Sequence, residues 1–286
     1  MVLKFYCIPI ALAASLCLLA LGCDSSPTDS QAEFRPTLYI EGFLSAGNPV
    51  DNIFVGVTTP LYETVDRNQS GVPDAAVTLE VDGAVSILSP RPGKTGYYHL
   101  PTLRIEPGKT YRLTVEIEGG IAQARTTVPF PPTVTASSTQ LTPGGDPFTA
   151  TWEGETGAGY LTETVARVLG DQIPLEALLG GFGRGGFGGF GGTGIDTTGF
   201  GALRDSLAEA SRWRYTRNQS TTLNLRQFSH YGTYVFRVFT IDANYADFLI
   251  SSTQDPQTLD EPRFHVSGGI GLFASMAADS VVFTLK

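Results

Sequence analysis

The sequence has little that could carry redox, metal or acid–base chemistry. It contains three cysteines and three histidines among 286 residues. The cysteines are Cys7, Cys17 and Cys23, so the long C-terminal part of the chain has none. Their placement excludes disulfides, thiolate metal sites and a cysteine nucleophile from that part. The histidines form no HxH or HxxxH pair of the kind that binds zinc, so we expect no metal site built on histidine.

Positive charge is also scarce, since 19 lysines and arginines stand against 28 acidic residues and give a net charge of −9. An acidic chain repels phosphate groups, which argues against a nucleic acid partner. Gly-Lys-Thr occurs at 93–95 and 108–110, but neither tripeptide has the earlier glycine of a phosphate-binding loop. The Gly-x-Ser-x-Gly elbow of hydrolases is absent. We expect a protein that is not an enzyme and needs no cofactor.

The first 22 residues have the three parts of a secretory signal peptide. Lys4 supplies the positive start, and residues 5–21 form a nearly continuous apolar run, shorter than a membrane-spanning helix. The run ends in Leu-Ala-Leu-Gly22-Cys23, which resembles a bacterial lipobox with Ala20 in the usual leucine position. This ending predicts cleavage between Gly22 and Cys23 and lipidation of Cys23 with palmitate or a similar chain. The alternative is an ordinary signal peptide in which Cys23 is incidental.

A polar stretch follows the candidate lipidation site. Residues 24–34 are rich in Ser, Asp, Thr and Gln, which is typical of a flexible tether, so 23–34 would hold the anchor and its linker. A bacterial lipid-modified cysteine carries two or three acyl chains, and more than one chain is what stable anchoring needs. We therefore expect an outer-membrane lipoprotein that faces the periplasm or the cell surface.

Residues 35–129 predict a β-sandwich. Val77, Leu79 and Val81 alternate with polar residues, which is the period of a strand with one buried face. Asp82-Gly83 is typical of a hairpin turn. Seven short strands favour an immunoglobulin-like or transthyretin-like fold, and the Pro-rich residues 130–132 would be a linker. The expected strands are 36–44, 53–58, 75–81, 84–88, 96–100, 111–117 and 121–128.

Residues 133–286 predict a second, fibronectin-like sandwich, so the fold class is all-β with two tandem sandwiches. Trp152 suits the central core aromatic of this half. An insertion at 169–219 interrupts it, and within it 180–201 is a low-complexity segment in which 12 of 22 residues are glycine, interspersed with phenylalanine. This segment could be a loop that docks a partner or an insertion that the fold tolerates, and the sequence leaves both interpretations open. The expected strands are 133–137, 148–153, 160–168, 220–226, 232–241 and 280–285, with helical composition at 173–179 and 202–212.

One segment has the composition of a calcium loop. Asp66, Asn68, Ser70 and the later Asp74 place oxygen ligands near Gly71. The same residue types are ordinary turn formers, and position 12 of an EF-hand-like loop would be a valine. The segment is thus a candidate cation site, although its composition fits an ordinary turn better.

Several short motifs together resemble a known family. In order, they are LYIEGFL at 38–44, PDAAVTL at 73–79, GYY at 96–98, PGKTYRL at 107–113 and SGGIGLF at 267–273. This order resembles the domain-of-unknown-function family 4249, envelope lipoproteins of Bacteroidota-type bacteria that are often encoded beside TonB-dependent receptors. The resemblance implies an accessory role at the outer membrane, and it supplies no catalytic residues.

The sequence leaves several functions open. The first is a lipoprotein that binds a partner protein, such as a TonB-dependent receptor, and assists nutrient uptake. The second is a surface glycan-binding module or adhesin, for which Trp213, Tyr215 and the phenylalanines of the Gly-rich segment would supply aromatic contacts. The third is a purely structural envelope protein. The ligand and the partner are not encoded in any motif that we recognise.

Overall fold

The computed structural model describes residues 34–60, 62–64, 66–174, 213–252 and 262–286. The expected signal peptide, the lipidation site and most of the tether lie outside these residues, as do the Gly/Phe-rich segment 180–201 and the two expected helical stretches around it, apart from residues 173 and 174. From Thr37 to Lys286 the chain forms one compact unit.

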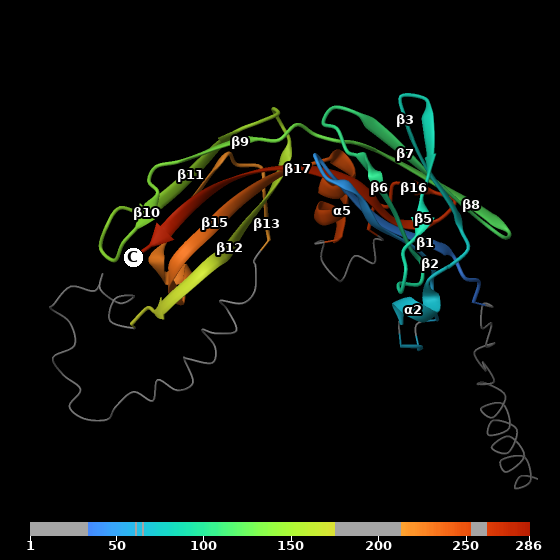
Figure 1. The fold of residues 1–286 in the computed structure, drawn as a ribbon, viewed down its shortest axis with the longest axis horizontal. Helices are drawn as coiled ribbons and strands as arrows, with labels where there is room; N and C mark the ends of the chain where they lie inside the picture. The colour runs from blue at the N-terminus through green and yellow to red at the C-terminus, as the bar shows by residue number, and fades with distance from the viewer. Residues whose placement is uncertain (1–33, 61, 65, 175–212, 253–261) are drawn as a thin grey trace, which may run out of the picture. The chain divides into compact units, whose positions relative to one another are not determined.

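The described residues are mostly strands, which confirms the all-β prediction (Figure 1). Two helices of the α type, α2 (Arg67–Ser70) and α5 (Ala243–Ser252), and one short 3-10 helix accompany them. The strands are β1 (Leu38–Ser45), β2 (Pro49–Val57), β3 (Ala76–Val81), β4 (Ala84–Ile87), β5 (Ser89–Pro90), β6 (Tyr97–Arg104), β7 (Thr110–Ile117), β8 (Gly120–Thr127), β9 (Thr133–Ala136), β10 (Gln140–Leu141), β11 (Phe148–Glu153), β12 (Gly159–Gln172), β13 (Arg214–Thr216), β14 (Ser220–Leu223), β15 (His230–Ile241), β16 (Val266–Ser267) and β17 (Ile270–Leu285).

These strands form three sheets. The largest has the order β13-β12-β15-β17-β1-β2-β6-β5, with β10 also paired to β17. A five-stranded sheet has the order β16-β8-β7-β3-β4, and a three-stranded sheet has the order β14-β11-β9. Each smaller sheet faces one part of the largest sheet, so that the inward side chains meet in two separate cores.

The last strand, β17, connects the two parts of the largest sheet (Figure 1). Its first part pairs in parallel with β1, from Ile270 to Met276. Its second part pairs antiparallel with β15, from Met276 to Leu285. Phe273 therefore packs in the first core, and Phe283 packs in the second. The division into two domains at 130–132 stays a prediction, and β17 takes part in both cores.

Strand periodicity accounts for both cores. In β7 the residues Tyr111, Leu113 and Val115 are buried, whereas Arg112 and Glu116 are exposed. In the second core the Phe148 and Phe283 rings stack with their centroids 4.3 Å apart. Trp152 is 2% exposed, as expected of a central core aromatic.

Close backbone approaches explain the glycines at the passage from β16 into β17. Gly271 has a φ of +120°, and a Cβ atom there would lie 1.9 Å from the carbonyl oxygen of Ile40. Gly268 has a φ of +77°, and its Cβ would lie 2.1 Å from the carbonyl oxygen of Ile121. Only glycine fits where the chain leaves β16, which pairs with β8, and enters β17, which pairs with β1.

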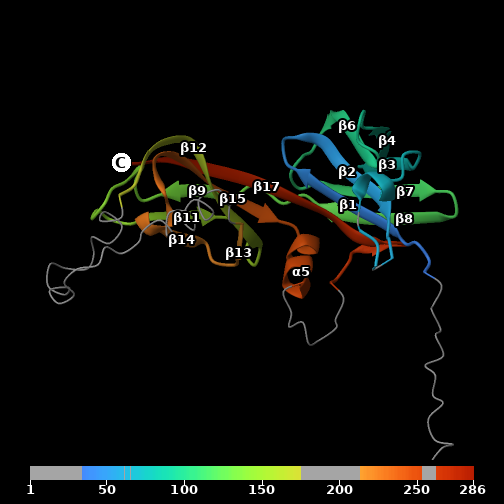
Figure 2. The ribbon, with the colours of Figure 1, turned by 90° about the horizontal axis from the view of Figure 1, so that it is seen from below.

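The structure differs from the strand predictions at several places, including four unpredicted short strands, β5, β10, β13 and β16, of which β13 lies within the predicted insertion. β17 begins at Ile270, ten residues before the predicted strand 280–285. β12 extends to Gln172, and Leu169 pairs with Gly232, so the first residues of the predicted insertion continue the sheet. Helix α5 occupies a stretch for which we predicted no element, and Figure 2 shows it beside β17.

Candidate functional site

The candidate calcium segment is a helix start. The Asp66 carboxylate accepts a hydrogen bond from the backbone N–H of Asn68, 2.9 Å away, and caps the four-residue helix α2. Ser70 is buried at the end of this helix. Among the described residues no group of three or more His, Cys, Asp or Glu side chains could hold a metal ion. Cation binding by Asp66, Asn68, Ser70 and Asp74 therefore stays a prediction, for which the capping role of Asp66 offers no support.

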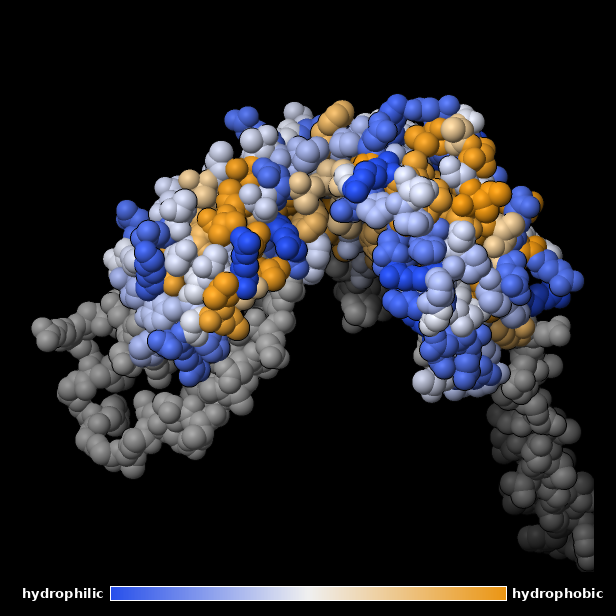
Figure 3. Space-filling model, viewed as in Figure 1, coloured by the Kyte–Doolittle hydropathy of each residue, from blue (hydrophilic) through white to orange (hydrophobic). Residues whose placement is uncertain are grey.

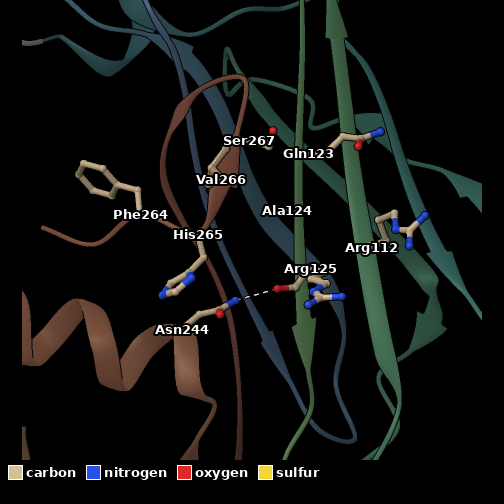
Figure 4. A pocket seen from close by; sticks show the side chains of 9 residues that line it. All are labelled: Arg112, Gln123, Ala124, Arg125, Asn244, Phe264, His265, Val266 and Ser267. Atoms are coloured by element: carbon tan, nitrogen blue, oxygen red, sulfur yellow. Dashed lines mark hydrogen bonds between the residues drawn. The ribbon is translucent and has the colours of Figure 1, made fainter.

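A hollow of about 660 Å³ lies on the outer face of the five-stranded sheet (Figure 4). It is lined from three strands of that sheet, β7, β8 and β16, from the start of α5 and from the segment that leads into β16. The lining residues are Arg112, Gln123, Ala124, Arg125, Asn244, Phe264, His265, Val266 and Ser267.

Two arginines stand side by side in this hollow. Arg112 on β7 and Arg125 on β8 are directly paired in the antiparallel register, and Glu80 on β3 follows next to Arg112 in the same row. Their side chains point away from the core because they alternate with buried residues. The Arg112 guanidinium lies 3.8 Å from the Glu80 carboxylate, and 58% of its side chain is exposed. A guanidinium pair of this kind can bind an oxyanion.

The opposite wall of the hollow comes from α5 and from residues 264–267. The Asn244 side-chain amide donates hydrogen bonds to the carbonyl oxygens of Arg125, at 2.7 Å, and Phe273, at 3.1 Å. These bonds attach the start of α5 to β8 and β17. The His265 ring lies 3.2 Å from the Asp247 carboxylate on α5. Phe264 packs near Phe248, with ring centroids 6.2 Å apart, and gives this wall an apolar part.

A buried polar cluster fixes α5 behind the hollow. Asp242 accepts hydrogen bonds from the Thr126 hydroxyl, at 2.5 Å, and from the backbone N–H of Tyr245, at 3.0 Å. The Ser275 hydroxyl lies 2.6 Å from the Thr126 oxygen. Burial raises the pKa of the Asp242 carboxyl, and the hydrogen bonds from Thr126 and the backbone oppose this rise. Asp242 thus caps α5 and links it to β8 and β17.

A second cluster of polar and aromatic side chains lies on β1, β2 and β6. The Arg67 guanidinium donates to the Glu41 carboxylate at 2.7 Å and lies 5.2 Å from the centre of the Phe54 ring. The Tyr39 hydroxyl donates to the same carboxylate at 2.9 Å. Burial and the Glu41 carboxylate raise the pKa of Tyr39 to about 12. These groups satisfy one another, so this cluster is better explained as a structural network than as a binding site.

The exposed face of β12, β15 and β17 has an apolar row. Val165, Val235 and Val282 are neighbours in the register, and Figure 3 shows apolar side chains gathered on this part of the surface. Trp213, 47% exposed, lies over Phe239 with ring centroids 4.8 Å apart. The structure thus places Trp213 on a sheet face, outside the arginine hollow.

No sequence motif singles out Arg112 and Arg125. The strand predictions 111–117 and 121–128 place both residues on exposed faces, so the available signal was the alternation with buried residues. The register between the two strands was not predicted, and it alone makes the arginines neighbours. The sequence shows no partner for His265, because residues 247 and 265 are brought together only by the fold.

In the part of the chain that the structure describes, no helix is long and apolar enough to cross a membrane. A comparison with curated proteins found no match. A comparison with protein families found one that is described as Domain of unknown function (DUF4249), and the match extends over residues 24–258. This stretch includes the strands of both cores except β16 and β17, and it confirms the resemblance that the short motifs indicated. The chain is therefore a member of the DUF4249 family.

Proposed function

We propose that this chain is a lipoprotein anchored in the outer membrane through Cys23, and that it serves as a non-catalytic binding protein of a nutrient-uptake system with a TonB-dependent receptor. The observation that carries the proposal is the order of features at the N-terminus. An apolar segment ends in Gly22-Cys23, a polar stretch follows, and the folded unit begins at Thr37.

Two further observations support a binding role over a catalytic one. The hollow beside α5 offers guanidinium and amide groups, which are suited to binding. Its ionisable neighbours are engaged in pairs, His265 with Asp247 and Arg112 with Glu80. A protein that presents such a site on a membrane anchor can hold a ligand near a receptor.

Membrane attachment is tested by metabolic labelling with palmitate and fractionation of cell envelopes. The wild-type protein should carry label and fractionate with outer membranes, because several acyl chains anchor stably. Cys23→Ser should lose both the label and the membrane attachment. Cys17→Ser, which changes another cysteine of the N-terminal segment, should keep both. Label and membrane attachment that persist in Cys23→Ser would refute lipidation at this residue.

The receptor partnership is tested by affinity purification of the tagged protein from detergent-solubilised outer membranes, followed by mass spectrometry. Recovery of one TonB-dependent receptor in a stoichiometric amount supports the uptake role. Recovery of the lipoprotein alone from a verified outer-membrane fraction contradicts a stable complex.

A second candidate function is glycan binding. The observation in its favour is the exposed Trp213 ring over Phe239, since exposed aromatic rings on a sheet face can stack against sugars. A glycan array separates the two candidates, because Trp213→Ala should abolish a glycan signal and should leave receptor recovery unchanged.

A further inference from the structure

We propose that Arg112 and Arg125 bind the oxyanion group of a small acidic ligand, a carboxylate or a phosphate, in the hollow beside α5. The inference goes beyond the proposed function, because it concerns the chemistry of the ligand and holds whether or not Cys23 is lipidated. It rests on the register of two strands, on unmatched positive charge and on the size and lining of the hollow.

The register places two like charges directly opposite one another. Arg112 on β7 pairs with Arg125 on β8, and like charges in such a pair destabilise a sheet. Glu80 faces Arg112 from the other side at 3.8 Å, which leaves Arg125 as the excess cation. The guanidinium of Arg125 has no hydrogen bond or ion pair with any described residue, although the chain as a whole has a net charge of −9. An anion between the two guanidinium groups removes this repulsion.

The carboxylates of α5 and its cap leave Arg125 available, whereas Arg112 already faces Glu80. Asp247 is the nearest carboxylate on α5, and it is paired with His265 at 3.2 Å. Asp242 is buried behind β8, where it accepts hydrogen bonds from Thr126 and Tyr245. Glu80 is the remaining carboxylate in the row, and it lies beyond Arg112, on the side away from Arg125. Neither Asp247 on α5 nor Asp242, which caps this helix, therefore takes the place of a ligand beside the two arginines.

The hollow has the size of a small-molecule site. Its volume of about 660 Å³ lies within the range of roughly 300–1,000 Å³ that is usual for ligand pockets. Gln123 adds an exposed amide beside Arg125, and Phe264 and Val266 add an apolar part to the opposite wall (Figure 4). A ligand with an acidic group at one end and a carbon skeleton at the other matches both walls.

The start of α5 makes the site rigid. Asn244 bonds to the carbonyl oxygen of Arg125 itself, so the backbone that carries the guanidinium is fixed from the helix side. Asp242 holds the same helix start to Thr126, the next residue along β8. Binding therefore requires ordering of the two arginine side chains and little movement of the backbone, which favours affinity.

The test is isothermal titration calorimetry of the full lipidated chain in detergent, at constant ionic strength. The probes are inorganic phosphate and glucuronate, with glucose as the neutral control. We expect one site per chain for at least one of the two anions and none for glucose. Arg125→Gln and Arg112→Gln should each weaken binding about tenfold or more, because each removes a charge-assisted hydrogen bond. Arg125→Lys should weaken it less, since it keeps the charge and loses the bidentate fork.

The matched control is Arg167→Gln, which removes the same charge from an exposed position on β12. This strand contributes to the second core and does not line the hollow. The variant should bind as the wild type does. The proposal is overturned if neither anion binds to a correctly folded protein, or if Arg167→Gln weakens binding as much as Arg125→Gln. Thermal unfolding of each variant shows that it is folded. A Cys23→Ser protein that stays attached to the membrane and still binds the anion would refute the lipid anchor at Cys23 and leave this inference intact.

Discussion

The Thr126 hydroxyl donates a hydrogen bond to the Asp242 carboxylate over 2.5 Å, across 116 positions of the chain. Thr126 lies in β8 of the first core, and Asp242 follows β15, which belongs to the second. The contact lies near Ser275, just before the residue at which β17 changes from β1 to β15 as its partner. The hydrogen bond thus links β8 to the segment after β15, at the place where β17 changes its partner strand.

Thr126→Val should destabilise the protein by about 1–3 kcal/mol, because the substitution leaves a buried carboxyl oxygen without its donor. Urea denaturation followed by circular dichroism measures the change. Thr110→Val is the control, since it removes an exposed hydroxyl pair with Thr127. It should cost less than about 1 kcal/mol, as is usual for surface sites. Equal effects of the two substitutions would show that the Asp242 contact does not contribute specially.

The pH dependence of stability should reveal Asp242. Burial raises the pKa of this carboxyl in the folded state, so the unfolded chain releases the proton at a lower pH. The contribution of Asp242 to stability should therefore fall as the pH rises from the ordinary aspartate value, about 3.9, through the raised pKa. Asp242→Asn removes this titration, so the variant should gain stability relative to the wild type as the pH rises.

The difference is measured as the urea midpoint of unfolding at a series of pH values, from the ordinary aspartate pKa upward through the raised pKa of Asp242. Asp146→Asn, at an exposed position, is the control for the loss of one carboxylate and should change the midpoint less than Asp242→Asn does. A wild type that gains stability over Asp242→Asn with rising pH would mean that hydrogen bonds outweigh burial at this carboxyl.

Gly271→Ala should be severe. The substitution needs a Cβ atom 1.9 Å from the carbonyl oxygen of Ile40, at a φ of +120°. We expect a loss of about 3 kcal/mol or more, or failure to fold, because strain and a backbone clash combine. Gly83→Ala is the matched control, with a φ of +80° and no atom near the added Cβ, so it should cost only about 1 kcal/mol. Thermal unfolding compares them, and similar losses would contradict the close approach of β17 to β1.

Loss of the Phe283 ring should weaken both cores. Phe283→Ala removes a ring that stacks on Phe148 in the second core, and substitutions of this kind cost about 3–5 kcal/mol. Because β17 also pairs with β1, we expect faster hydrogen exchange in β7, within the first core, as well as in β15. Hydrogen exchange with mass spectrometry measures both. Faster exchange confined to the second core would support two independent domains, as the Pro-rich residues 130–132 predicted.

Much of the strand content followed from local pattern. Alternation placed Val77, Leu79 and Val81 on one buried face, and the structure confirms Val77 and Leu79 as buried, with Val81 partly buried against the same core. Helix α5 was missed because its sequence is short and lacks a clear amphipathic period, and tertiary contacts to β17 and β8 stabilise it. The first half of β17 was missed because its glycines and alanines have low strand propensity, which the pairing with β1 overrides.

The sequence by itself determined the all-β class, the exposed sides of β7 and β8 and the family of the chain, because these depend on the order and spacing of residues. Only the tertiary structure decided that Arg112 lies beside Arg125, that His265 meets Asp247 and that Phe273 and Phe283 enter different cores. The physical reason is register. Periodicity says which face of a strand is buried, but the partner of each strand and their alignment depend on contacts between distant segments of the chain.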